Sequence, residues 1–540
     1  MKLKMITALL FMPLILSAGD FWFPEQATAQ KYRILSCSSQ TDFITGAALQ
    51  GLVARAVNAG KCDELLIIRH GGNSATEQEW IRRTAERLSA HDAGTLTLVE
   101  AVKHFRPLIE GYVLYSEDVS AGDFYQFRSS INLSANSATM LAGLFNALPV
   151  TEQQEAAFKN LGLKNSYDVR KIPPATVFKE HQNKFNRQML ASLDPKTGNL
   201  RDMIVAHNIS IGFGKEDADF FADQMTPPFT VLGWGAGDEF KHVEPFSRRG
   251  GIESVSNWAK NLTFLSAAAA GYQPEKIAVA KSVDTAKRRT VSFMLSDGDN
   301  TGWMMGNFWN TNYFKSPLTG KFPMGFSVAL ASLAQIAPVV VDRIAAEQPD
   351  NVSLIEFSGG YFYPDLFPVD ALREHARRLN IQMNRTGARL LCFIMNDSAS
   401  KNAQTAYQIF ADEIETLDGM MVMDYAPYHK GEGKIYWTKN RTGELIPAVT
   451  ARFAMWDGMN RPRAGTPETV AAAVNADTET HSWVAVHAWS KFPRTKNSGT
   501  DTGVYAVDRC IQNIDTNKVT VVSPDEMFRL IRREKEKSTR

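Results

Sequence analysis

Three apolar segments in the second half of the chain end in, or run into, acidic residues. Asp297 and Asp299 flank a glycine directly after one segment, Glu356 lies near the end of a second, and Asp424 follows a third. A carboxylate just past an apolar strand is destabilised by desolvation unless it is paired or faces a water-filled cleft. Carboxylates that meet in one cleft move one another's pKa apart, so that one stays protonated while another is ionised. Glycoside cleavage requires such an acid together with a base or nucleophile, and we predict that these four residues supply them.

Aromatic side chains and one histidine accompany the acids. Sugars present C–H faces that pack against Trp and Tyr rings, and the polar ends of such side chains reach hydroxyl groups. We therefore predict a carbohydrate substrate. The predicted sugar-binding residues are Trp303, Tyr361, Tyr363, Tyr425, His487 and Trp489.

Structural roles remain open for several of these residues. Asp297 and Asp299 could cap a turn, since Asp and Gly are turn formers. Glu356 lies inside an apolar run and could point into a packed layer beside a cationic partner. His487 could be a core histidine with its hydrogen bonds satisfied.

Two other functions also remain open. A non-catalytic glycan-binding protein would carry the same rings and carboxylates. The run from Asp297 to Thr301 also resembles the D-x-D-x-T motif of haloacid-dehalogenase-type phosphohydrolases. There the first Asp would be phosphorylated and Mg²⁺ would lie between the acids.

The elements that must position these residues alternate regularly. Parallel strands joined by helices bring their carboxyl ends to one edge. We predict a TIM-type (β/α) barrel over residues 285–540, with an irregular or seven-stranded form equally allowed. The strand candidates are Thr290–Leu295, Gly325–Val328, Val352–Phe357, Ala388–Ile394, Gly419–Met423, Leu445–Val449, Trp483–Val486 and Val519–Val522. The helix candidates are Ala331–Glu347, Val369–Met383, Ala403–Leu417, Thr469–Asn475, Val504–Ile514 and Asp525–Arg533.

Residues 30–275 also alternate strand-like and helix-like segments, so an α/β region of one to three subdomains is predicted. Strands are expected at residues 64–68, 111–115 and 229–232, and helices at 135–146 and 177–193. The glycine-rich run Gly233–Gly237 lacks the apolar helix that a dinucleotide site requires, and we interpret it as a loop beside a cleft. This region would buttress the barrel or extend its cleft.

Residues 1–29 have the pattern of an export signal. Two lysines precede about a dozen apolar residues, too few to cross a bilayer, and small residues at Ala27 and Ala29, or at Ser17 and Gly19, offer cleavage sites. We expect a periplasmic or extracellular protein without a transmembrane segment. A net charge of +1 excludes the basic footprint of a nucleic-acid binder. The four cysteines lack zinc-site spacing, so no metal or cofactor is predicted. The oligomeric state is not determined by the sequence.

The run Ser358–Pro364 reads S-G-G-Y-F-Y-P and resembles the signature of the GxGYxYP putative glycoside hydrolase family. Ser358 stands where the signature has its first glycine. The segments around Asp297, Asp424 and His487 resemble the same family, most clearly between Thr290 and Asp525. The resemblance implies an exported protein associated with polysaccharide utilisation, a barrel-type C-terminal domain and glycosidase activity. It transfers no catalytic residue, so the roles above rest on the strand ends.

Overall fold

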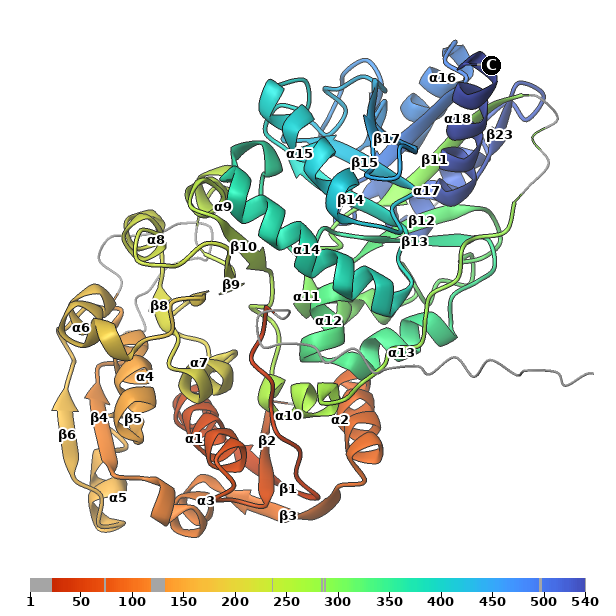
Figure 1. Ribbon diagram of the computed structural model, residues 1–540. Helices are drawn as coiled ribbons and strands as arrows, with labels where there is room; N and C mark the ends of the chain where they lie inside the picture. The colour runs from red at the N-terminus through yellow and green to blue at the C-terminus, as the bar shows by residue number, and fades with distance from the viewer. Residues whose placement is uncertain are drawn as a thin grey trace, which may run out of the picture.

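The computed structural model describes residues 22–71, 74–117, 132–235, 237–282, 285, 288–494 and 498–539. Over these residues the chain forms three small parallel sheets followed by one large curled sheet (Figure 1). The small sheets lie at the lower left of the view in red to yellow, and the large sheet lies at the upper right in green to blue. Helices pack against the sheets, so the predicted α/β class is confirmed.

The first two sheets each have three strands, in the orders β2-β1-β3 and β5-β4-β6. Between them lies the long helix α1, which begins after Ser39, whose side chain accepts a hydrogen bond from the Asp42 N–H. Gly51 lets this helix approach α7 closely, since a Cβ at Gly51 would lie 2.5 Å from the Asp202 carbonyl oxygen. The elements are β1 (Lys31–Cys37), α1 (Gln40–Asn58), β2 (Glu64–His70), α2 (Ala75–Leu88), β3 (His91–Thr97), α3 (Leu98–His104), β4 (Gly111–Tyr115), α4 (Ser134–Phe145), β5 (Ala147–Thr151), α5 (Glu155–Asn160) and β6 (Asn165–Asp168).

The third sheet has the order β10-β9-β7-β8, with every pair parallel. Its strands are almost entirely buried. Part of the predicted helix 177–193 is wrong, because residues 189–192 form a central strand of this sheet. The elements are α6 (Pro174–His181), β7 (Met189–Ser192), α7 (Arg201–His207), β8 (Ser210–Gly212), α8 (Lys215–Ala222), β9 (Phe229–Gly233), α9 (Glu239–Arg248), β10 (Gly251–Ser254) and α10 (Leu262–Ser266).

The large sheet follows the path β16-β17-β15-β14-β13-β12-β11-β20-β18-β19, and β23 pairs with β11. Each of the eight predicted C-terminal strands has a counterpart in it. Its strands are β11 (Arg289–Leu295), β12 (Met324–Val328), β13 (Val352–Glu356), β14 (Leu390–Met395), β15 (Gly419–Asp424), β16 (Ile435–Lys439), β17 (Leu445–Thr450), β18 (Phe453–Met455), β19 (Ala464–Gly465), β20 (His481–Val486) and β23 (Val519–Val521). Beside it lie α11 (Thr301–Met304), α12 (Leu330–Ile336), α13 (Pro338–Ala346), α14 (Val369–Thr386), α15 (Lys401–Glu413), α16 (Pro467–Ala476), α17 (Val504–Ile511), α18 (Pro524–Thr539) and the small ribbon β21 (Phe492–Pro493) with β22 (Thr500–Asp501).

The predicted TIM-type barrel is not confirmed; the structure shows a large curled sheet instead. The segment from β17 to β18 pairs with β15 in its first half and with β20 in its second. At its centre the Ala451 N–H donates to the Val422 carbonyl (2.9 Å) and the Arg452 N–H to the Trp483 carbonyl (3.2 Å). The strand β23 pairs only with the first three residues of β11. The carboxyl ends of the main parallel strands nevertheless share one edge.

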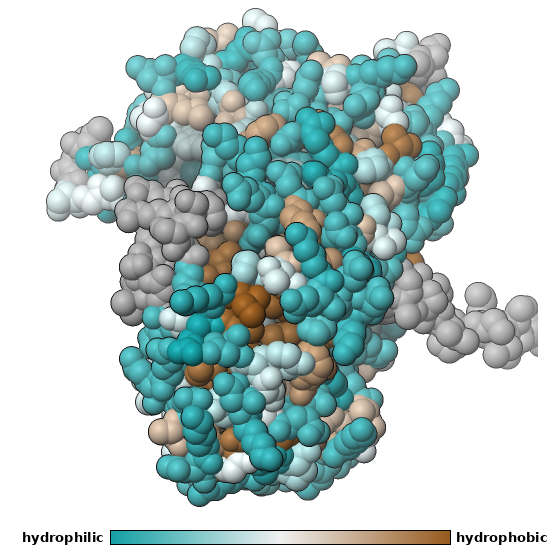
Figure 2. Space-filling view, turned by 90° about the vertical axis from the view of Figure 1, so that its left-hand side faces the viewer, coloured by the Kyte–Doolittle hydropathy of each residue, from teal (hydrophilic) through white to brown (hydrophobic). Residues whose placement is uncertain are grey.

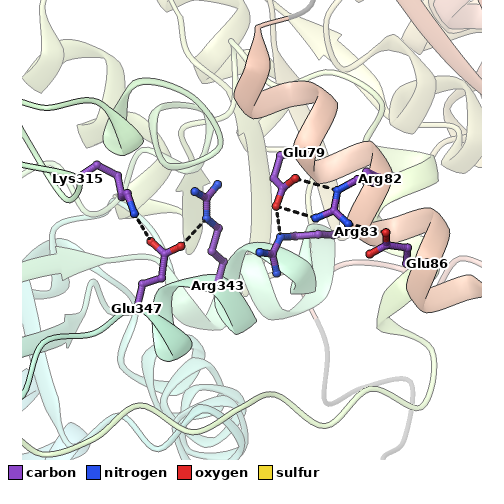
Figure 3. Close-up of polar contacts among 7 residues, drawn as sticks. All are labelled: Glu79, Arg82, Arg83, Glu86, Lys315, Arg343 and Glu347. Atoms are coloured by element: carbon purple, nitrogen blue, oxygen red, sulfur yellow. Dashed lines mark hydrogen bonds and ion pairs between the residues drawn. The ribbon is translucent and has the colours of Figure 1, made fainter.

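Helix α2 of the first sheet packs near α13 of the large sheet, where Figure 3 shows charged side chains on both helices. Glu79 binds Arg82 and Arg83 along α2, and Glu347 binds Lys315 (2.9 Å) and Arg343 (3.1 Å). These bonds do not cross between the helices. An ion pair between Arg87 on α2 and Asp342 on α13 (3.5 Å) does cross the interface. Further contact comes from Arg343, whose guanidinium lies over Trp309 (4.2 Å) and Trp80 (5.4 Å), and from the Trp80 Nε1–H, which donates to the Met305 carbonyl (2.7 Å).

The segment before β1 is built into the core. Trp22 is 6% exposed and stacks on His375, with the ring centroids 5.2 Å apart. Its N–H donates to Gln335 Oε1 (2.9 Å), and its carbonyl accepts from Thr230 Oγ1 (3.3 Å). Trp22 therefore joins the third small sheet to the helices of the large one. The predicted export signal falls largely on residues 1–21, outside the described residues.

The face of the molecule shown in Figure 2 is mainly hydrophilic. Figure 2 shows the left-hand face of the molecule, where hydrophobic residues gather in a hollow at mid-height. Across the chain from residue 22 onward, wherever it is described, helices fall short of the length and apolarity needed to cross a membrane.

Candidate active site

A cavity of about 600 Å³ lies where the carboxyl ends of the large sheet meet those of β9 and β10. Its size falls within the range of ligand sites, roughly 300–1,000 Å³. Both halves of the molecule supply its walls, and acids and rings dominate them. The lining residues are Trp234, Gly237, Glu239, Val255, Asn257, Trp258, Ser296, Asp297, Asp299, Asn300, Phe357, Tyr361, Ile394, Met423, Tyr428, His487, Trp489 and Lys491.

Asp297 and Asp299 enter this cavity from the turn after β11. Asp297 has a φ of 70°, an uncommon backbone conformation for a non-glycine residue. Its carboxylate accepts hydrogen bonds from Trp489 Nε1 (2.5 Å) and from the Ser296 hydroxyl. Burial raises the pKa of Asp299 well above its usual range, and the negative charge of Asp297 raises it further. The turn therefore presents one carboxylate held by hydrogen bonds and one carboxyl that is stabilised in its protonated form.

Glu239 enters the same cavity from the third small sheet. It is the first residue of α9, whose N-cap Asp238 accepts a hydrogen bond from the Lys241 N–H (3.1 Å). Burial raises the pKa of Glu239 to about 7, and the charge of Asp297 adds to this effect. A hydrogen bond donated by the Tyr361 hydroxyl acts in the opposite direction, because it stabilises the ionised carboxylate. A carboxyl that titrates near neutral pH is suited to general acid–base catalysis.

The loop after β13 positions Tyr361 against Glu239. Ser358 and Gly359 have φ values of 41° and 80°, so the serine adopts a left-handed conformation that glycine favours. At Gly360, φ is 149°, and an added Cβ would lie 2.7 Å from the Glu253 carbonyl oxygen. This close approach permits an antiparallel bridge: the Tyr361 N–H donates to the Glu253 carbonyl (2.7 Å), and the Glu253 N–H donates to the Tyr361 carbonyl (2.9 Å). The loop thereby joins the large sheet to β10.

A buried glutamate–histidine pair, Glu253 and His242, lies behind Glu239. Glu253 Oε1 lies 2.5 Å from His242 Nε2, and both side chains are almost completely buried. The same nitrogen lies 2.9 Å from the Gly235 N–H, so the pair also holds the loop that carries Trp234. Burial raises the pKa of Glu253, and its charge in turn raises the pKa of Glu239.

His487 and Tyr428 also line the cavity. The His487 ring stacks on Trp456, with centroids 4.2 Å apart and an interplanar angle of 11°. Its Nδ1 lies 2.9 Å from the Ser490 hydroxyl, and burial lowers its pKa. The ring is therefore a neutral hydrogen-bonding group near pH 7.

Two of the predicted catalytic carboxylates do not line the cavity. Glu356 is fully buried, and its two oxygens accept hydrogen bonds from the Ala331 N–H (2.9 Å) and the Gly359 N–H (2.8 Å). Asp424 is 2% exposed and accepts hydrogen bonds from the Ser398 N–H (2.8 Å) and hydroxyl (2.9 Å). Each carboxylate fixes a neighbouring backbone segment. The partners of Glu356 are thus the backbone N–H groups of Ala331 and Gly359, where a cationic side chain was expected.

Three of the predicted sugar-binding rings lie behind the cavity. Trp303 is 1% exposed and packs edge-on against Trp489. Tyr363 is completely buried, with its hydroxyl 3.2 Å from that of Tyr361. Tyr425 contacts Tyr363 and the ring of Phe240. Tyr361, His487 and Trp489 do line the cavity, together with Asp297 and Asp299.

Several cavity residues were missed by the sequence reasoning. Glu239 follows the glycine-rich run that was interpreted as a loop beside a cleft, and Asp238 before it is a helix N-cap signal that could have drawn attention. Trp234 lies within that run. Trp258 carries no local signal, whereas Tyr428 follows β15 within a few residues, so the strand-end argument could have included it. Within the described ranges, no group of three or more His, Cys, Asp or Glu residues is arranged to hold a metal ion.

Three family models match the chain. The GxGYxYP putative glycoside hydrolase C-terminal domain matches residues 287–532, the GxGYxYP_N second domain matches 109–176, and the GxGYxYP third domain matches 187–267. A crystal structure of a putative hydrolase from Bacteroides thetaiotaomicron VPI-5482 aligns with a TM-score of 0.75 and 19% sequence identity, covering 94% of this chain and 96% of that one. This likeness shows a shared fold. None of the curated proteins compared matches the chain.

Proposed function

Because the chain belongs to the GxGYxYP putative glycoside hydrolase family, we propose that it hydrolyses glycosidic bonds in an oligosaccharide or polysaccharide, with Glu239 and Asp297 as its catalytic carboxylates. One observation carries this proposal. Glu239, whose pKa is raised to about 7, shares a ring-lined cavity with Asp297, whose carboxylate is held by Trp489. Two carboxyl groups in different environments are what glycoside cleavage requires.

Glu239 is the general acid in this mechanism. It donates its proton to the glycosidic oxygen as the bond from that oxygen to the anomeric carbon breaks. Asp297 acts on the other side of the sugar, either by taking a proton from a water molecule that attacks the anomeric carbon or by attacking that carbon itself. In the second route the ionised Glu239 takes a proton from the water that later releases the sugar from Asp297.

Asp299 has a different role from its neighbour. Burial and the neighbouring Asp297 carboxylate both raise the pKa of Asp299 well above its usual range, which favours its protonated form. A neutral carboxyl can donate a hydrogen bond to substrate or water, and it does not repel the Asp297 charge. An Asp299→Asn variant keeps a neutral group of the same shape and should retain more activity than Asp297→Asn.

The rings hold the sugar in place. Trp234 stacks roughly parallel to Tyr361, at 6.1 Å and 18°, and Trp489 fixes Asp297 while lining the same cavity. Neutral His487 supplies a hydrogen-bonding edge for a hydroxyl group.

We extend the proposal to a (β/α) barrel closed through the β17–β18 segment, and to export directed by the apolar N-terminal segment.

The test is a screen of the purified protein against plant and host polysaccharides, with product analysis by chromatography. Glu239→Gln and Asp297→Asn should each lower kcat by about 10²–10⁴-fold, the usual contribution of such groups. Asp397→Asn is the matched control, because Asp397 also follows a strand but is exposed and lies outside the cavity. Full turnover in both Glu239→Gln and Asp297→Asn would overturn the assignment.

Two outcomes separate the alternatives. Glycan binding without products would identify a non-catalytic binding protein. Hydrolysis of a phosphate ester that EDTA abolishes would favour the D-x-D-x-T interpretation, since Asp297 and Asp299 both face the cavity.

A further inference from the structure

A second cavity, of about 280 Å³, adjoins the first across one side chain. It lies between the start of α2, the turn after β10 and the segment after α11. Trp258 lines both cavities. A ligand that fills the first cavity and continues past Trp258 therefore enters the second.

Trp258 is an exposed ring on a fixed turn. The residue is 52% exposed, which is unusual for so large an apolar side chain. The turn that carries it is held by the Ala259 N–H, which donates to the Ser256 carbonyl (2.7 Å), and by the Gly302 N–H, which donates to the Val255 carbonyl (3.1 Å). The ring also stands perpendicular to Trp489, with centroids 6.1 Å apart. The exposed face is thus presented in a defined position instead of on a loose loop.

The second cavity contains polar groups that suit sugar hydroxyls. Glu77 lies 3.4 Å from Lys260 through one oxygen, and both side chains are about one-fifth exposed. The Asn307 amide lies in the same lining. An apolar ring beside a carboxylate, an ammonium and an amide is the combination that binds a sugar ring by its face and its edge.

From this arrangement we propose that the second cavity is an additional sugar-binding subsite. The glycan chain stacks on Trp258 between this subsite and the catalytic cavity. This proposal rests on the proposed function. The substrate is then a chain of several sugar units that occupies both cavities at once. Cleavage takes place within that chain.

The test measures how affinity depends on chain length. Isothermal titration calorimetry is carried out in the Glu239→Gln background, which prevents turnover, with the disaccharide and hexasaccharide of the cello-, xylo-, manno-, malto-, chito- and galacturonan series. In at least one series the hexasaccharide should bind about tenfold more tightly than the disaccharide, the gain expected from one stacked ring. Adding Trp258→Ala should remove this gain, so that the hexasaccharide binds no more tightly than the disaccharide of the same series.

Control variants separate binding from folding. Trp437→Ala truncates a partly buried tryptophan on β16 outside both cavities and should preserve the gain. Trp258→Phe should restore part of it. Equal affinity for short and long chains in every series, no binding in any series, or a gain that survives Trp258→Ala would overturn the subsite.

The two proposals fail in different ways. If the wild type hydrolyses glycans but binds short and long chains equally well, the hydrolase assignment stands and the subsite is refuted. If binding strengthens with chain length and requires Trp258, but the wild type hydrolyses no glycan, the subsite stands and the catalytic assignment is refuted.

Discussion

Removing the Tyr361 hydroxyl should shift the pH profile of activity. The Tyr361→Phe variant keeps the ring and the loop but loses the hydrogen bond that the hydroxyl donates to Glu239. That bond lowers the pKa of Glu239, which is nevertheless raised to about 7 by burial. Without the bond the pKa of Glu239 rises further.

The size of the shift follows from the two states of the acid. A hydrogen bond to a charged group contributes about 1.5–3 kcal/mol, and one to a neutral group about 0.5–1.5 kcal/mol. The difference of about 1.4 kcal/mol corresponds to roughly one pKa unit. Glu239 must be protonated to act as the acid, so kcat/KM falls as pH rises through its pKa. The alkaline limb of the variant should therefore move upward by about one unit.

The assay is the pH dependence of kcat/KM, which reports the ionisations of the free enzyme. Tyr363→Phe is the matched control, because its hydroxyl contacts Tyr361 at 3.2 Å and makes no bond to Glu239. Its alkaline limb should stay where the wild-type limb lies. Circular dichroism would establish that both variants fold. An alkaline limb that is unmoved in Tyr361→Phe, or that moves to lower pH, would refute Glu239 as the acid.

Three further perturbations test the supporting structure. The pKa of Glu356 is raised by burial to about 7 from an ordinary value of 4.5, so its stabilising contribution is full below pH 4.5 and lost as pH rises through about 7. Urea titrations measure the free energy of unfolding of the wild type and of Glu356→Gln at each pH. Between pH 4.5 and about 7, the wild-type value minus the variant value should fall by roughly 3 kcal/mol. A difference that stays constant with pH would contradict the raised pKa of Glu356. Gly360→Ala should break the bridge to Glu253 and lower both kcat and the melting temperature; an unchanged melting temperature would count against the close approach. Where the proposed export removes an N-terminal segment, Trp22 should stay in the processed chain because of its contacts in the core. Mass spectrometry of the processed protein should then find an N-terminus that precedes Trp22, near Gly19, and a chain starting at Gln30 would contradict its structural role.

Eight strands of the large sheet could be predicted, because each is a short apolar run bounded by polar residues. Strands β16, β18 and β19 of the same sheet were not expected. The helices were less certain. Residues 331–347 were expected as one helix, but the chain forms α12 and α13, because Pro338 cannot continue a helix and instead begins the next one. The expected helix over 177–193 failed for another reason. Its apolar residues near Leu190 belong to a strand buried on both faces, and periodicity alone does not separate such a strand from a buried helix.

The strand-end argument pointed to the edge of the sheet where the cavity lies, but not to the direction of each side chain. Asp297 and Asp299 face the cavity because the turn after β11 reverses the backbone at a positive φ. Glu356 lies at the end of β13 and turns toward the backbone of α12, while Asp424 turns toward the loop after β14. Successive strand residues point to opposite faces, so a position at a strand end leaves both directions open. Only the packing of neighbouring loops decides between them.

The acid that sequence reasoning missed shows why the two halves of the chain must be considered together. Glu239 belongs to α9 beside the third small sheet, and Asp297 follows the first strand of the large one. The motif loop connects them: Gly360 allows the backbone of Tyr361 to pair with Glu253 on β10, and the Tyr361 hydroxyl then reaches Glu239. The pKa of Glu239 depends on burial against the large sheet and on the charge of Asp297, so its raised value exists only when the halves are docked. The glycines and tyrosines of the motif thus serve to assemble the site from two parts, which explains why the motif itself contains no catalytic carboxylate.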